Sequence, residues 1–94
     1  MRLDEKTKEV IKNSVLKFDP DAQVYLFGSR TDDTKKGGDI DILIISNKIN
    51  LSEKIKILSS IFDSIEEQKI DLVIARSLNE TPFIKYISHQ IIPL

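Results

Sequence analysis

Two aspartates separated by one isoleucine are the residues of this chain that most plainly suggest chemistry. Asp39 and Asp41 alternate with isoleucines in a stretch that has the pattern of a β-strand. Because successive side chains of a strand point to opposite faces, both carboxylates project from one face, roughly 6.5 Å apart at their Cα atoms. Like charges placed in this way repel each other. A hard divalent cation such as Mg²⁺, which takes carboxylate oxygens and bridges to substrate phosphates, is the simplest group to lie between them.

A third acid belongs to a later apolar run. Asp71 is the lone acid of the segment 69–75, which otherwise reads as an apolar strand. A buried apolar strand rarely accepts an unpaired carboxylate, because an isolated buried charge is costly. If this strand lies beside residues 39–46, Asp71 shares a face with the first two acids, and three carboxylates converge.

A glycine turn precedes the acids. Gly28 and Ser29 end the apolar run 23–27, and a polar loop over residues 30–38 follows them. Glycine lets the backbone approach phosphate oxygens closely, and a helical turn after it would aim N–H groups at them. Ser29 adds a hydroxyl donor, and Arg30 adds a fork of donors that suits a phosphate.

Hydrophobic periodicity and turn signals place these residues on a small set of elements. The sequence predicts helices over residues 3–18 and 50–68 and from 81–82 onward, strands over 23–27, 39–46 and 69–75, and a short edge strand over 91–94. This order favours a small α/β (α+β) fold, a mixed sheet with helices packed on at least one face. We expect Tyr25, Phe27 and Phe62 to be core residues, and Phe83, Ile84 and Ile87 to face inward from the last helix.

Composition narrows the class of protein. The 94 residues, 40% hydrophobic and 31% charged, are typical of one globular domain, which we expect to span 1–94. The net charge of -1 gives no general attraction to nucleic acid or to anionic membranes, so we expect neither as a direct partner. The chain has no cysteine, no apolar run of about 20 residues and a charged N-terminus, which favours the cytoplasm.

The spacing of these motifs resembles a known family. Gly28-Ser29, then Asp39-Ile40-Asp41 and later Asp71 are similar to the nucleotidyltransferase superfamily that includes DNA polymerase β. The short length, together with Leu26–Arg30 and Phe83–Ile87, resembles its minimal nucleotidyltransferase (MNT) class, the antitoxin type paired with HEPN-domain toxins. The resemblance implies a polymerase-β-like core. It also implies that Asp39, Asp41 and Asp71 are catalytic and hold two Mg²⁺ ions, and that Gly28 and Ser29 grip the triphosphate.

The implied reaction transfers a nucleoside monophosphate, AMP from ATP, to a hydroxyl and releases pyrophosphate. For the antitoxin branch the acceptor is a tyrosine of the HEPN toxin, which makes the toxin a partner in a hetero-oligomer and the chain a type VII-like antitoxin. The residues agree with this chemistry, because two metal ions stabilise the entering and leaving oxygens of an in-line displacement. Asp71 would be near the attacking hydroxyl and would accept its proton.

One departure from the family pattern leaves a second function open. Members commonly continue as G-S-R-A-R-G, whereas Arg30 is followed here by Thr31, Asp32 and Asp33. Two acids near a triphosphate are repulsive, and Lys35 and Lys36 either compensate or belong to a solvated loop. The alternative is a catalytically weak or inactive antitoxin that neutralises its toxin by binding alone. A third hypothesis is a small-molecule nucleotidyltransferase, whose acceptor domain a partner chain would have to supply.

Simpler interpretations exist for each site residue. Asp39 and Asp41 would also suit a solvent-facing strand edge, and Asp71 an ion pair with a lysine or arginine. Gly28-Ser29 alone is an ordinary turn, and Arg30 suits a surface ion pair. The lone histidine, His89, is expected to be structural or exposed.

Overall fold

The computed structural model describes residues 3–32, 34, 38–65 and 69–94. Within these ranges the elements are α1 (Glu5–Leu16), β1 (Gln23–Phe27), the 3₁₀ helix η1 (Gly28–Thr31), β2 (Ile40–Ile45), α2 (Leu51–Ser64), β3 (Ile70–Ala75), α3 (Pro82–Ile87) and β4 (Ile92–Pro93). Every predicted helix and strand is present, with ends that differ by a few residues. The predicted α/β fold with a small mixed sheet is confirmed.

The helix starts follow from local hydrogen bonding. At the start of α2, the Asn50 side chain accepts from the backbone N–H of Glu53 at 3.2 Å, and the Glu53 carboxylate accepts from the N–H of Asn50 at 3.4 Å. This is the capping box expected from the sequence. At the start of α3, the Thr81 hydroxyl accepts from the N–H of Ile84 at 3.1 Å, and Pro82 occupies the first helical position. The helix α2 ends at Ser64, and the rest of the predicted helix, 66–68, lies outside the described residues.

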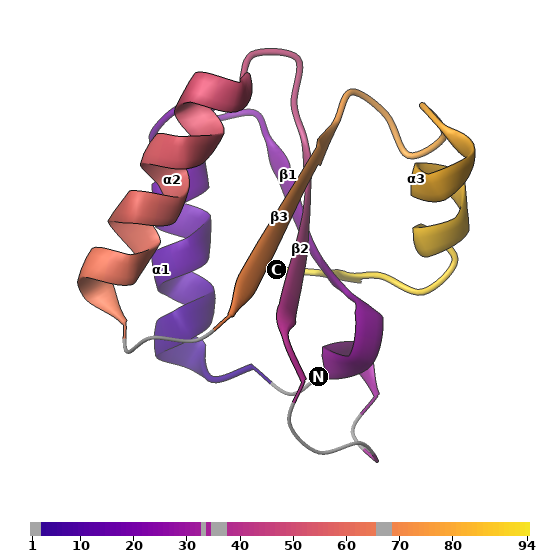
Figure 1. Ribbon diagram of the computed structural model, residues 1–94, viewed down its shortest axis with the longest axis horizontal. Helices are drawn as coiled ribbons and strands as arrows, with labels where there is room; N and C mark the ends of the chain where they lie inside the picture. Colours follow the sequence, from indigo (N-terminus) through magenta and orange to yellow (C-terminus); the bar gives the residue numbers. More distant parts are fainter. Residues whose placement is uncertain (1–2, 33, 35–37, 66–68) are drawn as a thin grey trace.

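The described strands form one sheet in the order β3-β2-β1-β4. The strand β1 is antiparallel to both β2 and β4, whereas β2 and β3 are parallel and are joined by the crossover helix α2. Helices α1 and α2 lie side by side on one face of the sheet, and α3 lies on the other face (Figure 1). The sheet therefore has one face covered by two long helices and one face covered only in part by a helix of six residues.

Each face of the sheet has its own apolar cluster. The larger cluster lies under α1 and α2 and includes Ile11, Val15, Leu26, Ile40, Ile42, Ile44, Ile57, Ile61 and Leu72. The smaller cluster lies under α3 and consists of Phe27, Leu43, Ala75 and Ile84, with Tyr25, Val73 and Ile87 packed against it. The alternation of β2 is thus as predicted, with isoleucines at even positions in the larger core.

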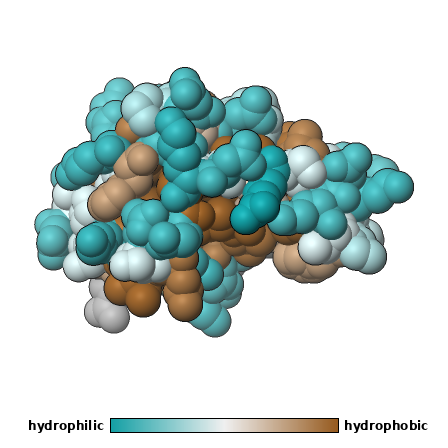
Figure 2. All heavy atoms as spheres, turned by 90° about the horizontal axis from the view of Figure 1, so that it is seen from above, coloured by the Kyte–Doolittle hydropathy of each residue, from teal (hydrophilic) through white to brown (hydrophobic). Residues whose placement is uncertain are grey.

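Two aromatic residues expected in the core are at the surface instead. Phe62 is 43% exposed on α2, in a stripe with Leu51 and Ile55, because α2 packs against the sheet through Ile57 and Ile61. The helix has two adjacent apolar stripes, and periodicity alone does not tell which one is buried. Apolar atoms reach the molecular surface in the view of Figure 2. None of the helices in the described ranges combines the length and apolar character needed to cross a membrane.

Phe83 is the second correction, because it is 55% exposed while Ile84 of the same helix is 4% exposed. With only six residues, α3 has room for one buried position and for the half-buried Ile87. Phe27 is buried as predicted, and Tyr25 is half-buried with its hydroxyl donating to Gln23 at 2.8 Å.

A buried polar network ties the loop after α1 to the loop after β2. The Ser46 hydroxyl donates to Asp19 at 2.6 Å and accepts from the backbone N–H groups of Lys48 and Ile49, both at 3.1 Å. Asp19 is 3% exposed and also accepts from the N–H of Asp21 at 3.0 Å. The hydrogen bond from Ser46 lowers the pKa of Asp19, so the carboxylate remains ionised in mildly acidic solution.

Replacing Ser46 by alanine is expected to destabilise the fold by about 1–3 kcal/mol, because buried polar partners lose a hydrogen bond. Since the pKa of Asp19 is lowered in the folded protein, its stabilising contribution is complete above the ordinary carboxyl pKa and is lost as the pH falls through the lowered value. The difference between wild type and Ser46→Ala in urea unfolding should therefore be larger at pH 7 than in strong acid. Ser59→Ala, at an exposed serine of α2, is the matched control. A constant difference at all pH values would contradict the role given to Asp19.

Candidate active site

Strand pairing places two of the predicted acids side by side. Asp41 of β2 is in register with Asp71 of the parallel strand β3, and registered residues of neighbouring strands lie about 4.8 Å apart along the hydrogen-bonding direction. Both side chains project from the face that carries Leu43 and α3. Asp71 is exposed and Asp41 is half-buried, so solvent reaches both residues. The six-residue α3 covers only part of this face (Figure 1), and Asp71 is exposed.

Asp39 lies just before β2 and is paired with a lysine. Its carboxylate is 3.5 Å from the Nζ atom of Lys69, and the backbone N–H of Ile40 donates to the Lys69 carbonyl at 3.0 Å. Both side chains are largely solvated, with 44% of the Asp39 side chain and 73% of the Lys69 side chain exposed. In the described part of the chain, no three acidic, histidine or cysteine side chains are grouped closely enough to enclose a metal ion. Of the three predicted acids, Asp41 and Asp71 thus form a registered pair, and Asp39 forms an ion pair with Lys69.

Gly28 lies against Asp41, one of the two registered acids. Its φ angle is +76°, a backbone conformation that residues with a side chain rarely adopt. A Cβ atom at this position would overlap the Oδ2 atom of Asp41. The antiparallel register Phe27↔Asp41 explains the contact, because the turn begins directly beside the acid. The glycine is therefore required both for the turn and for the space that the Asp41 carboxylate occupies.

The electrostatics of Asp41 reflect its crowded surroundings. Burial raises the pKa of Asp41, and the negative charges of Asp71 and Asp39 raise it further, while Lys69 acts in the opposite direction. The site thus carries negative charge that the protein balances only in part. Carboxylate oxygens on adjacent strands, with unbalanced charge and an open face, are donors that suit a hard cation such as Mg²⁺.

Replacing Lys69 by methionine is expected to tighten Mg²⁺ binding several-fold, because the ammonium group both occupies Asp39 and repels a second cation. The fold should lose no more than about 1 kcal/mol, since exposed ion pairs contribute little. Isothermal titration with MgCl₂ at low ionic strength measures the first effect, and urea unfolding in EDTA measures the second. Lys85→Met, on α3, is the control for the loss of one positive charge. Weaker Mg²⁺ binding in Lys69→Met would show that the lysine supports the site.

Hydrogen bonds hold the turn that follows Gly28, and one of the residues that make them is the predicted phosphate ligand Arg30. Arg30 donates from Nε and Nη2 to the carbonyl of Gly38, at 3.2 and 3.1 Å, which ties η1 to the residue before Asp39. The Asp32 carboxylate accepts from the backbone N–H and the hydroxyl of Thr34, at 2.9 and 2.6 Å. Asp32 therefore has a local role in the turn that the sequence did not predict. Asp33, Lys35 and Lys36 lie outside the described residues.

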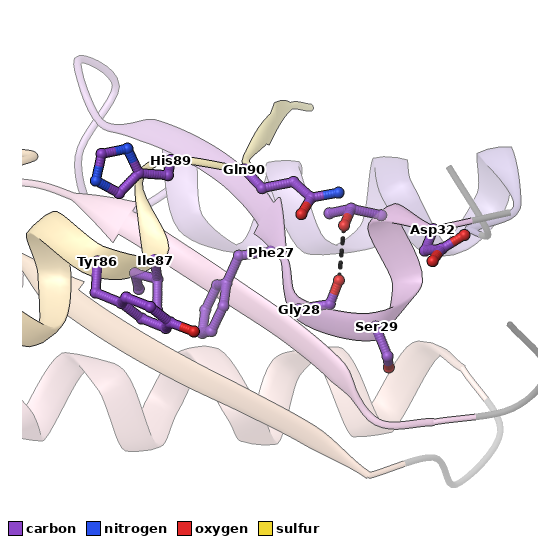
Figure 3. A pocket seen from close by; sticks show the side chains of 9 residues that line it. Phe27, Gly28, Ser29, Asp32, Tyr86, Ile87, His89 and Gln90 are labelled. Carbon is purple, nitrogen blue, oxygen red and sulfur yellow. Dashed lines mark hydrogen bonds between the residues drawn. The ribbon is translucent and has the colours of Figure 1, made fainter. Parts of the chain in front are cut away.

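A cleft of about 470 Å³ opens beside Gly28, between η1 and the end of α3. Its lining includes Phe27, Ser29, Tyr86 and Gln90 (Figure 3). His89 also borders the cleft and is exposed, one of the two states expected for it. Sequence reasoning missed Tyr86 and Gln90 as site residues, because nothing in their local pattern indicates that α3 folds back beside η1.

The comparisons with known proteins agree with the geometry of the strands and the turn. The family model for a nucleotidyltransferase domain matches residues 8–92, from within α1 to the first residue of β4. A search of curated proteins finds no significant match to the chain. The matched region contains the glycine turn and all three acids. The chain therefore belongs to the nucleotidyltransferase domain family.

Proposed function

We propose that this nucleotidyltransferase transfers AMP from ATP to a hydroxyl of a partner protein, and that the acceptor is a tyrosine of a HEPN-domain toxin. In this proposal the protein is a cytoplasmic, type VII-like antitoxin that forms a hetero-oligomer with its toxin. The observation that carries the transferase chemistry is the register of Asp41 with Asp71, directly beside Gly28. The antitoxin role is supported by the resemblance of Leu26–Arg30 and Phe83–Ile87 to the MNT class.

The proposed roles follow from the position of each residue. The backbone of Gly28 and the hydroxyl of Ser29 bind the triphosphate, while Asp39, Asp41 and Asp71 hold Mg²⁺. Bound Mg²⁺ would neutralise the charge that develops on the entering and leaving oxygens. The acceptor oxygen forms a bond to the α-phosphorus as the bond to the β-phosphate oxygen breaks, and pyrophosphate leaves with that electron pair. Asp71, which is exposed, takes the acceptor's proton and passes it to solvent.

Label transfer tests this function. The protein is incubated with Mg²⁺, α-labelled ATP and the product of the neighbouring gene, and label on the partner is counted. We expect transfer by the wild type, loss of transfer in Asp39→Asn, and full transfer in Asp63→Asn, whose exposed acid lies at the end of α2. Transfer that survives Asp39→Asn would remove this acid from the site. No transfer with any nucleoside triphosphate would contradict the proposed activity.

Three observations favour neutralisation by binding alone as the second candidate. Arg30 is engaged by the carbonyl of Gly38, Asp39 is paired with Lys69, and the described acids do not enclose a metal ion. The double variant Asp39→Asn, Asp41→Asn separates the two functions in cells that express the partner. Full protection by this variant would favour neutralisation by contact, whereas loss of protection with retained binding to the partner would favour catalysis.

A further inference from the structure

The cleft between η1 and the end of α3 has the size of a site for a small organic ligand. Its volume of about 470 Å³ is within the range of roughly 300–1,000 Å³ that is common for such sites. Among the described residues that line it, none is a lysine or an arginine. The described lining includes the carboxylate of Asp32, which would repel a phosphate, while the ring of Tyr86 and the amide of Gln90 suit an uncharged ligand.

The cleft adjoins the candidate active site at Gly28. Gly28 lines the cleft and also contacts the carboxylate of Asp41, so the same residue borders both regions. A ligand whose charged end lies at the acids and the glycine turn has this cleft as the adjoining space. A nucleoside triphosphate has that form, with a charged tail at one end and an uncharged, aromatic base at the other.

Tyr86 is the residue of the cleft best suited to a base. It is 76% exposed, and Figure 3 shows its ring extending toward Phe27, which is 8% exposed. The Gln90 side chain extends toward the glycine turn and offers both a donor and an acceptor. Exposed aromatic rings bind nucleobases by stacking. We infer that the cleft holds the nucleoside half of the nucleotide, with the base stacked on Tyr86; this inference rests on the function proposed above.

The protein that carries the acceptor hydroxyl reaches the acids by a different route from the nucleotide. A stable contact between two proteins buries about 1,200–2,000 Å² in total, which a cleft of this size does not provide. The exposed side of Asp71, on the edge strand β3, is open to a partner without crossing the cleft. The two substrates thus reach the acids from different sides, the nucleotide along η1 and the acceptor over β3.

The experiment compares ATP with inorganic tripolyphosphate, which lacks the nucleoside, by isothermal titration in Mg²⁺ buffer. Tyr86→Ala is expected to weaken ATP binding by about 5- to 150-fold, the range for loss of one stacked base, and to leave tripolyphosphate binding unchanged. Tyr86→Phe, which keeps the ring, should bind ATP as the wild type does. Phe83→Ala is the matched control, because Phe83 is an aromatic residue of the same helix, is 55% exposed and does not line the cleft.

A second measurement locates the base directly. The chain has two tyrosines, so the Tyr25→Phe variant leaves Tyr86 as the single tyrosine signal in an NMR spectrum. ATP should shift the ring protons of Tyr86 through the ring current of the base, and tripolyphosphate should not. ATP binding that is unchanged in Tyr86→Ala, or wild-type affinity equal for ATP and tripolyphosphate, would overturn the inference and leave the proposed function standing. Failure of the wild type to bind either ligand would overturn both.

Discussion

Asp41→Asn is expected to lower nucleotidyl transfer by at least about 10³-fold, because in the proposed mechanism it removes a metal ligand and with it several kcal/mol of transition-state stabilisation. The same substitution is expected to make the metal-free protein more stable at neutral pH. Asp41 is in register with Asp71, and like charges at paired strand positions destabilise a sheet by up to about 1 kcal/mol. Asparagine keeps the shape of the side chain and removes one of the two charges. Activity and stability should therefore change in opposite directions.

The pH dependence of stability distinguishes this effect from simple repacking. The pKa of Asp41 is raised in the folded protein, so the folded state binds a proton more tightly than the unfolded state. Its contribution to stability is fully present below the ordinary carboxyl pKa and is lost as the pH rises through the raised value. In EDTA, the advantage of Asp41→Asn over wild type should accordingly appear as the pH rises from strong acid to neutrality.

Urea unfolding in EDTA between pH 3 and 8 measures the advantage of Asp41→Asn, and label transfer in Mg²⁺ measures the activity. Asp63→Asn, at an exposed acid on α2, should change neither the stability nor the transfer activity. Saturating Mg²⁺ should reverse the order of stabilities, because a ligand that binds only the folded wild type stabilises it by mass action. A variant that is less stable than wild type at pH 7 in EDTA would show that Asp41 supports the fold.

Gly28→Ala is expected to reduce both stability and transfer, through two separate costs. The φ angle of +76° disfavours any residue with a Cβ atom, by roughly 1 kcal/mol or more. The new methyl group would also displace the carboxylate of Asp41, which it overlaps in the native position. Because a small misplacement of a catalytic group can cost about 10²-fold in rate, we expect the loss of transfer to exceed what the loss of stability explains.

Gly38→Ala is the control for the backbone cost, since Gly38 also has a positive φ angle, of +93°. Both variants should lose stability in urea unfolding, but Gly28→Ala should lose much more activity when assayed well below its Tm. The double variant Gly28→Ala, Asp41→Asn tests the contact, because removing the charge of Asp41 should leave little further activity for alanine to remove. Equal activities of the two single glycine variants would separate Gly28 from the chemistry.

Much of the fold was predictable, because local signals and periodicity agree along most of the chain. The alternation of aspartate and isoleucine fixes which face of β2 is polar, and the Asn50–Glu53 capping box marks the start of α2. The expected position of the strand 69–75 beside 39–46 brings Asp71 into register with Asp41. These features depend on residues near one another in sequence or on the preference of a crossover helix for joining parallel strands.

The remaining features depend on contacts between distant segments. Nothing in the local pattern of Ser46 indicates that it donates to Asp19, 27 residues earlier in the chain. The sequence also does not predict that Phe62 is exposed, because both apolar stripes of α2 have helical spacing. The cleft wall at Tyr86 exists because α3 turns back over the face that carries Phe27. The roles of the acids, the glycine turn and Arg30 stay predictions that the proposed variants test.

The position of Asp71 has a consequence for local dynamics. Asp71 is the second residue of β3, and β3 lies at the edge of the described sheet, where its backbone has a neighbour on one side only. Edge strands open locally at a lower free energy than the strands inside a sheet. The amides of β3 should exchange with deuterium sooner than those of β2, and any ligand that joins the two strands should slow this exchange. Such a ligand would hold β2 and β3 together at the edge of the sheet. Without it, the proposed site would lose its arrangement on warming before the core unfolds.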